Sequence, residues 1–264
     1  MRIDLDGRIA LVSASTGGIG EAIALGLAQA GARVAVNGRT AVSVGAAIER
    51  LQRAVPDGSF IATVGDVSMR EGMEAALTAA GDVDVLVNNL GIYRPVAATE
   101  ITDDEWEEML RVNLLSGTRL AQRLLPQMTR KGWGRVLFIS SDAGVSIPAD
   151  MVHYGVSKAA VIAAARGLAK AVRATGVTVN SVIAGPTLTD GVREFIEAKL
   201  GGQHDWDAAE HEFMRSERPS SLLGRLIRPE EIANMVVYLA SPLASATTGG
   251  AIRVDGGYVD SILP

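Results

Sequence analysis

Cysteine is absent from the 264-residue chain, histidine occurs three times, and only four of the 25 basic residues are lysines. Without cysteine the chain can form neither disulfide bonds nor thiolate metal sites. His204 and His211 stand among acidic residues at a spacing typical of a polar surface, and none of the histidines belongs to a metal-ligand cluster, so no metal site is predicted. Because thiols are missing and imidazoles scarce, any chemistry must rest on other side chains.

The chain also lacks excess positive charge and long apolar segments. Its formal net charge of −5 argues against a nucleic-acid partner or a basic membrane-binding face. Asp4, Asp6 and Arg8 interrupt the N-terminal segment, which therefore does not read as a signal peptide. The uncharged stretch 234–252 contains Pro242 and two glycines, unlike a membrane span. We expect a cytoplasmic protein with no nucleic-acid or membrane partner.

Length and hydrophobic pattern predict a single α/β domain covering residues 1–264. Nearly half of the residues (48%) are hydrophobic, enough for a sizeable core. Short apolar, β-branched runs alternate with segments of helical spacing, which is typical of a doubly wound, Rossmann-type parallel sheet flanked by helices. Seven strands are predicted, at 8–14, 33–37, 59–64, 84–89, 135–140, 177–183 and 251–255; helical segments include 19–30, 41–54, 103–131 and 152–172.

One region departs from this alternation. Residues 190–228 contain two weak helical patterns, the pair Gly201-Gly202, and mixed polar and aromatic side chains. Since the region follows the sixth predicted strand and has no linker composition, we interpret about 187–228 as a lid over a substrate site.

A turn of small residues, Ser13 to Gly20, joins the first predicted strand to a helix. Such a turn lets backbone N–H groups and the helix N-terminus approach a pyrophosphate. Position 23 is isoleucine, so the common G-x-G-x-x-G fingerprint is incomplete, and no G-K-[ST] follows, which excludes a phosphate-binding NTPase. Tight packing of strand against helix is the alternative explanation.

The end of the second predicted strand bears on the choice of cofactor. An acidic residue at this point would bind the ribose 2′-hydroxyl of NAD, whereas arginine accommodates the 2′-phosphate of NADP. Here the strand is followed by Arg39, which favours NADP over NAD unless this arginine is simply a solvated surface residue. Asp66 and Asn89 end the next two strands, where the edge of a cofactor would lie, although such residues taken alone are more often turn residues or helix caps.

Three side chains form the strongest chemical pattern. Tyr154 and Lys158 are four positions apart on a predicted helix and therefore share one face. A nearby ammonium stabilises a phenolate, so we expect Lys158 to lower the pKa of Tyr154 and make it a useful acid or base. Ser141, at the end of the fifth predicted strand, can donate a hydrogen bond to a substrate carbonyl oxygen.

Together these motifs make the chain from Gly7 to about Tyr258 resemble the short-chain dehydrogenase/reductase (SDR) family, in particular its branch of 3-oxoacyl-acyl-carrier-protein reductases. The resemblance rests on an ordered set of motifs. They are the glycine-rich turn, Asp66, NNxG at 88–91, Asn113 in RVNL, Ser141, YxxxK at 154–158, NSVIAGPTLT at 180–189, PEEIA at 229–233 and TGGAIRVDGG at 248–257.

The resemblance implies reversible, NADP(H)-dependent hydride transfer between a ketone or aldehyde and an alcohol. Tyr154 would be the acid/base, Lys158 would bind the nicotinamide ribose, Ser141 would polarise the carbonyl, and Asn113 would hold a water that relays protons. The expected cofactor-binding residues are Ser13, Thr16, Gly17, Gly18, Ile19, Gly20, Arg39, Asp66, Val67, Asn89, Leu90, Gly91, Tyr154, Lys158, Gly185, Thr187 and Thr189.

Four positions depart from the family pattern. Ala14 replaces the first glycine of TGxxxGxG, Leu90 the alanine of NNAG, and Ala184 the proline of the PG motif. Gly17 stands where NADP-binding members often have a basic residue, so Arg39 would bind the 2′-phosphate largely alone. None of these changes removes a catalytic group.

The substrate is expected to bind between the lid and the segments 90–98 and 142–153. We expect Ser141, Tyr93, Ile147, His153 and Phe195 to contact it, although ordinary lid packing also explains the aromatic residues. The alanine-rich run 159–169 implies, through the resemblance, a four-helix contact in a homotetramer or homodimer, but a buried helix of a monomer would look alike. Two alternative functions are also considered: a non-catalytic dinucleotide-binding regulator, and the same enzyme using NAD(H).

Overall fold

Seven parallel strands form one sheet in the order β3-β2-β1-β4-β5-β6-β7. This confirms the predicted α/β class, and the computed structural model describes residues 3–200 and 205–262. The order reverses between β1 and β4, which places a ligand crevice at the carboxyl ends of these strands. The strands are β1 (Ile9–Val12), β2 (Arg33–Gly38), β3 (Phe60–Val64), β4 (Val85–Asn88), β5 (Gly134–Ser141), β6 (Val177–Ala184) and β7 (Ala251–Val254).

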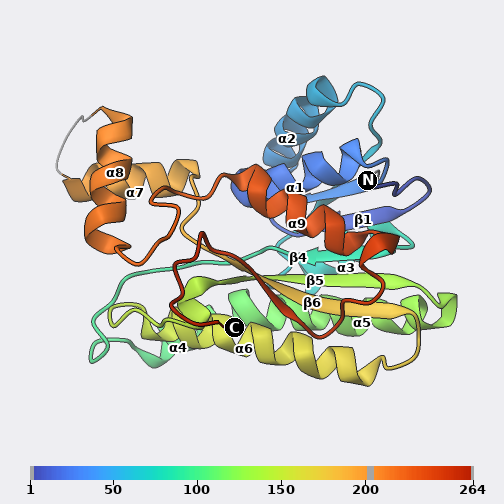
Figure 1. The fold of residues 1–264 in the computed structure, drawn as a ribbon. Helices are drawn as coiled ribbons and strands as arrows, with labels where there is room; N and C mark the ends of the chain where they lie inside the picture. The colour runs from blue at the N-terminus through green and yellow to red at the C-terminus, as the bar shows by residue number, and fades with distance from the viewer. Residues whose placement is uncertain (1–2, 201–204, 263–264) are drawn as a thin grey trace.

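Helices cover both faces of the sheet (Figure 1). Val12 and Leu11, neighbours on β1, point into different hydrophobic cores, because successive strand residues face opposite sides. The first core is closed by α1 (Gly18–Gln29), α2 (Ala41–Ala54) and α9 (Pro229–Ala240). The second is closed by α3 (Arg70–Ala80), α5 (Ser116–Lys131) and α6 (Val152–Ala171). Within 3–200 and 205–262, no helix is long and apolar enough to cross a membrane.

The helix predicted over 103–131 is interrupted. It begins as α4 (Asp103–Leu110), passes through a π-helical turn at Arg111–Leu115 and continues as α5. A π-helical turn holds an extra residue, so the side chains before and after it face different directions than in an unbroken α-helix. Asn113 lies within the turn and is buried. The interruption therefore sits at one of the predicted catalytic residues.

The two weak helical patterns of the predicted lid are both helices, α7 (Asp190–Leu200) and α8 (Trp206–Glu217). They project from one end of the molecule (Figure 1) and have their own hydrophobic cluster. That cluster consists of Ile196, Ala209, Phe213, Met214 and Leu226. Gly201, Gly202 and His204 lie outside the described residues.

A buried carboxylate attaches α8 to the chain that follows it. Glu210 is 6% exposed and accepts hydrogen bonds from the Leu226 amide (2.8 Å) and from Arg228 Nη2 (3.3 Å). We expect Glu210→Ala to lower the free energy of unfolding by about 2 kcal/mol, because it leaves a buried amide and a guanidinium without their acceptor. Urea denaturation measures this. Glu212→Ala, which removes the partner of Arg215 on the outer face of α8, is the control and should have little effect; equal losses would contradict the assignment.

Candidate active site

The glycine-rich turn leads from β1 into α1 and leaves the start of that helix open. Its N-cap, Gly17, has no side chain, so no side-chain hydrogen bond caps the first amides of α1. Gly18 has φ +53°, and a Cβ on Gly20 would overlap the Ala14 carbonyl oxygen, so the turn requires glycine at both positions. Ala14 itself has φ +51°, which costs a residue with a Cβ about 1 kcal/mol and explains why the family prefers glycine there.

Two residues expected to bind cofactor hold this turn in place. The Ser13 hydroxyl accepts hydrogen bonds from the amides of Asn89 (2.9 Å) and Leu90 (3.0 Å). Asn89 Nδ2 donates to the carbonyl oxygens of Ser13 (3.1 Å) and Ala14 (3.0 Å). These bonds fasten the turn to the end of β4. Ser13 is 2% exposed, and its hydroxyl is engaged within the protein.

The other expected cofactor residues divide into two groups. One group lines a single cavity of about 250 Å³: Ile19, Asn89, Gly91, Tyr154, Lys158, Gly185, Thr187 and Thr189. The other group lies outside that lining, on the turn or after β2, β3 and β4, at the carboxyl edge of the sheet: Ser13, Thr16, Gly17, Gly18, Gly20, Arg39, Asp66, Val67 and Leu90. Of these, Arg39 is exposed, whereas Asp66 Oδ1 accepts a hydrogen bond from the Ser68 amide (2.9 Å).

These residues fit a dinucleotide. The open N-terminus of α1 offers amide donors and a positive dipole end to a pyrophosphate. A Cβ on Gly17 would meet nothing within 4 Å, so space lies beside the turn, and Arg39 supplies a cation at the adjacent strand end.

Ser141, Tyr154 and Lys158 meet at the same cavity. Ser141 ends β5, while the other two lie one turn apart on α6. Lys158 Nζ donates to the Ile139 carbonyl (3.0 Å) and lies 5.8 Å from the centre of the Tyr154 ring. A Cβ on Gly91 would come within 3.1 Å of Lys158 Nζ, so glycine allows the loop after β4 to approach the ammonium closely.

Burial controls the protonation of Tyr154 and Lys158. It raises the pKa of Tyr154 to about 12, opposed by the hydrogen bond with Ser141, and lowers the pKa of Lys158 to about 8. In this structure the Tyr154 pKa is raised overall, because desolvation of the buried phenol is the largest cause of its shift. Tyr154 is a neutral phenol near pH 7 and can donate a proton.

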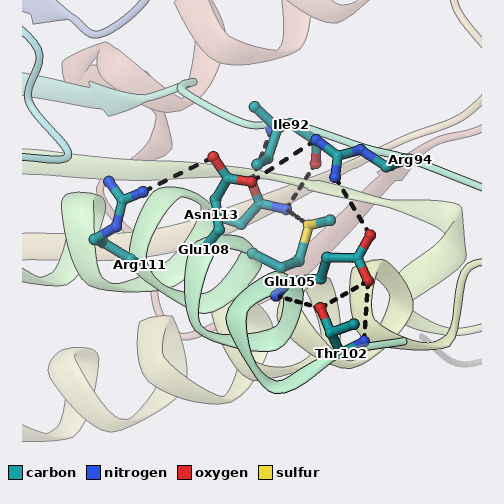
Figure 2. Close-up of polar contacts among 8 residues, drawn as sticks. Ile92, Arg94, Thr102, Glu105, Glu108, Arg111 and Asn113 are labelled. Atoms are coloured by element: carbon teal, nitrogen blue, oxygen red, sulfur yellow. Dashed lines mark hydrogen bonds and ion pairs between the residues drawn. The ribbon is translucent and has the colours of Figure 1, made fainter. Parts of the chain in front are cut away.

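Asn113 joins the π-helical turn to the loop after β4 (Figure 2). Its Oδ1 accepts from the Ile92 amide (2.7 Å), and its Nδ2 donates to the Ile92 carbonyl (2.9 Å) and to Ser157 Oγ (2.9 Å). Around it, Arg94 pairs with Glu105 and Glu108 of α4 (Figure 2). The Asn113 side chain thus fastens the loop containing Gly91 to α6, next to Lys158.

The expected substrate residues are only partly brought together. Tyr93 and Phe195 line the cavity; the ring of Tyr93 meets that of Tyr154 edge-on at 6.2 Å. Ile147 is outside the lining and 47% exposed. His153 is 1% exposed, packs on Trp106 and lines a separate cavity of about 190 Å³. Successive helix residues face different sides, so His153 points away when its neighbour Tyr154 faces the cavity.

Two charged residues of the cavity lining were missed by the sequence reasoning, Asp142 and Arg218. Asp142 follows Ser141 directly, and its position beside a catalytic candidate was the available signal. Arg218 directly follows α8, and its local sequence, R-S-E-R, resembles any charged surface segment. Only the folded path of the lid brings it to the cavity.

Comparisons with known proteins agree with this geometry. The family model described as enoyl-(acyl carrier protein) reductase matches residues 13–259. The "uncharacterized oxidoreductase YvaG" of Bacillus subtilis (strain 168) is 43% identical, over 99% of this chain and all of its own length. The 3-oxoacyl-[acyl-carrier-protein] reductase FabG of Aquifex aeolicus is 34% identical, over 97% of this chain and 99% of its own.

A solved structure extends the likeness. The crystal structure of L-sorbose reductase from Gluconobacter frateurii, complexed with NADPH and L-sorbose, superposes with a TM-score of 0.93 at 28% identity, covering 99% of this chain and 100% of that one. Because the family model matches most of the chain, the sequence and the fold support the same family assignment. The chain belongs to the short-chain dehydrogenase/reductase family of oxidoreductases.

Proposed function

We propose that the protein is an NADP(H)-dependent oxidoreductase that interconverts a ketone or aldehyde and the corresponding alcohol, with Tyr154 as the acid/base. The observation that carries this proposal is the convergence of Ser141, Tyr154 and Lys158 on a cavity that also reaches α1 through Ile19. The likeness to a reductase crystallised with NADPH supports the choice of cofactor.

The proposed chemistry divides between the cofactor and the side chains. When bound, NADPH supplies the hydride that reaches the carbonyl carbon. The Ser141 hydroxyl, which donates to Asp142 Oδ1 (2.7 Å) in this structure, turns its hydrogen to the substrate and holds the carbonyl oxygen. The neutral Tyr154 phenol transfers its proton to that oxygen as the alcohol forms. Lys158 binds the nicotinamide ribose and returns a proton to Tyr154. In the oxidation direction the same groups act in reverse, with Tyr154 accepting the proton.

Asn113 acts in this scheme as a positioning residue. Its side-chain amide is hydrogen-bonded to Ile92 and Ser157. These bonds keep the loop at Gly91 close to Lys158. A water that relays protons to Lys158, as the family resemblance implies, would lie beside this contact. We also propose a cytoplasmic homotetramer or homodimer assembled through the alanine-rich face of α6.

The preference for NADP is tested at Arg39. We expect Arg39→Ala to raise the KM for NADPH about 30-fold, because a charge-assisted hydrogen bond to the 2′-phosphate is lost, and to leave the KM for NADH nearly unchanged. Arg33→Ala is the control, since Arg33 is exposed at the opposite end of the same strand. A wild-type enzyme that prefers NADH would refute the preference.

A substrate panel tests the function itself. Ketones, aldehydes and 3-oxoacyl thioesters are offered with NADPH and with NADH, and oxidation of the cofactor is followed by absorbance. Turnover of any carbonyl compound that requires the protein supports the proposal. Tight binding of NADPH without turnover of any compound would favour the dinucleotide-binding regulator, and a preference for thioesters would place the chain with the 3-oxoacyl reductases.

A further inference from the structure

The cavity that holds Ser141 and Tyr154 has a cation at its lid end. Arg218 directly follows α8 and lines this cavity. The aromatic rings of Phe213 and Tyr258 flank its guanidinium, at 5.9 Å and 5.2 Å from their centres. The rings hold the guanidinium at the cavity wall and keep water from one side of it, which strengthens its attraction for an anion.

Few protein acceptors satisfy the Arg218 guanidinium. Its Nη1 donates to the Glu217 carbonyl (2.8 Å), while its Nε is buried and lacks a hydrogen-bond partner among the described residues. Three other lid arginines, Arg215, Arg225 and Arg228, each pair with a glutamate. No described residue forms an ion pair with Arg218. A buried, charged donor without an acceptor is costly to a fold, and such groups concentrate where a ligand supplies the acceptor.

The nearest acidic group in the cavity does not neutralise Arg218. Asp142 is 7% exposed, and its Oδ1 is occupied by the Ser141 hydroxyl (2.7 Å) and the Ala143 amide (2.9 Å). Arg218 acts on it only through space, and burial raises the Asp142 pKa, so this carboxyl is more easily protonated than one in water. The cavity therefore favours an anion at its lid end.

We propose that Arg218 binds a carboxylate of the substrate, and that the enzyme acts on small oxo acids and the corresponding hydroxy acids. The inference rests on the proposed function, because it assigns the carbonyl end of the same molecule to Ser141 and Tyr154. A planar guanidinium matches a carboxylate through two parallel hydrogen bonds, which lysine cannot reproduce. The reaction leaves the carboxylate unchanged: the carbonyl carbon gains a hydride, and the carbonyl oxygen gains a proton from Tyr154.

The rest of the cavity suits a short molecule. Its volume is about 250 Å³, and Tyr93, Phe195 and Phe213 form apolar walls between the two polar ends. The acyl group of a 3-oxoacyl thioester carries no carboxylate to pair with Arg218, so the charge distribution favours oxo acids over such thioesters.

Matched pairs of compounds test whether the enzyme recognises a carboxylate on its substrate. One is 5-ketogluconate, and the other is L-sorbose, which has a hydroxymethyl group in place of the carboxylate and otherwise the same carbon chain. Pyruvate and methyl pyruvate form a second pair. We expect wild-type kcat/KM to favour the acid of at least one pair, and Arg218→Gln to lower kcat/KM for that acid by at least about 30-fold, mostly through KM. The uncharged partner should change by less than about threefold in the same variant.

Arg215→Gln is the control, since Arg215 lies one turn earlier on α8, points outward and pairs with Glu212. It should leave both members of each pair unchanged. Arg218→Lys should recover only part of the loss, because lysine keeps the charge but not the paired hydrogen bonds. A wild-type preference for the uncharged partners, or equal losses for acid and uncharged compound in Arg218→Gln, would overturn the proposal.

Calorimetric titration of the protein–NADP⁺ complex with 5-ketogluconate and with pyruvate separates this proposal from the hydride-transfer function. Binding of either acid by the wild type and not by Arg218→Gln supports the carboxylate site even if no compound is turned over, in which case only the proposed reaction fails. Turnover of uncharged ketones, with neither acid bound or reduced, would leave the reaction standing and refute the role of Arg218.

Discussion

Tyr154→Phe is expected to lower kcat for carbonyl reduction by at least about 1,000-fold, the upper part of the range for loss of a general acid. The variant removes only the phenolic oxygen and keeps the ring, which packs edge-on against Tyr93. Because burial raises the Tyr154 pKa to about 12, the wild-type group is protonated throughout the neutral range and can donate a proton next to Ser141, to which it is hydrogen-bonded. The Kd for NADPH, measured by fluorescence titration, should change by less than about threefold, since phenylalanine preserves the packing.

Tyr93→Phe is the matched control, because Tyr93 is the other tyrosine in the lining of the same cavity. Its hydroxyl has no proton-transfer role in the scheme, so kcat should stay within about threefold of wild type. Full activity of Tyr154→Phe would refute the mechanism, and an equal loss in both variants would show that the effect comes from packing.

Lys158→Met is expected to lower kcat at least about 100-fold and, at the same time, to stabilise the fold at pH 7 by about 2 kcal/mol. Burial lowers the Lys158 pKa from 10.5 to about 8, so the folded protein keeps a charged lysine at pH 7 at a cost of about 3 kcal/mol. Methionine removes that cost. The Ile139 carbonyl loses its hydrogen-bond donor at the same time, which reduces the net stabilisation by about 1 kcal/mol.

The stabilisation by Lys158→Met should depend on pH in one direction. Below pH 8 both folded and unfolded chains hold the Lys158 proton, and the burial cost is present in full. Between pH 8 and 10.5 the folded chain releases the proton while the unfolded chain keeps it, so wild-type stability rises relative to the variant. Urea denaturation of both proteins across this range should show the difference shrinking. Lys170→Met, at an exposed lysine of the same helix, should show neither effect; a difference that grows with pH would refute the buried-cation account.

Much of the fold could be predicted because the strands are buried on both faces. The predicted strands 84–89 and 135–140 contain consecutive apolar positions, at 85–87 and 136–139, which distinguishes central parallel strands from amphipathic ones. The break in the helix predicted over 103–131 could not be predicted in this way. A π-helical turn adds one residue without changing the apolar composition, and it is stabilised by contacts of Asn113 with Ile92 and Ser157, distant in the sequence.

The candidate site also contains residues whose positions could be predicted from the sequence and residues whose positions could not. Tyr154 and Lys158 could be predicted to lie together, since both belong to one helix and their separation is set by helix geometry. The position of Arg218 depends on how α8 returns toward the sheet, which local sequence does not determine. His153 shows the opposite error: closeness to Tyr154 in the chain suggested a shared cavity, but helix geometry turns adjacent side chains apart.

The separate hydrophobic cluster under α7 and α8 has a consequence for evolution. Ser141, Tyr154 and Lys158 lie on elements that pack in the two cores of the sheet, whereas Arg218 packs against a cluster with five buried members in the described part of the chain. Substitutions that exchange Arg218 or its aromatic neighbours should therefore disturb the sheet little. Descendants of this chain could acquire new substrates by accumulating changes in one segment, while the reactive centre is inherited intact.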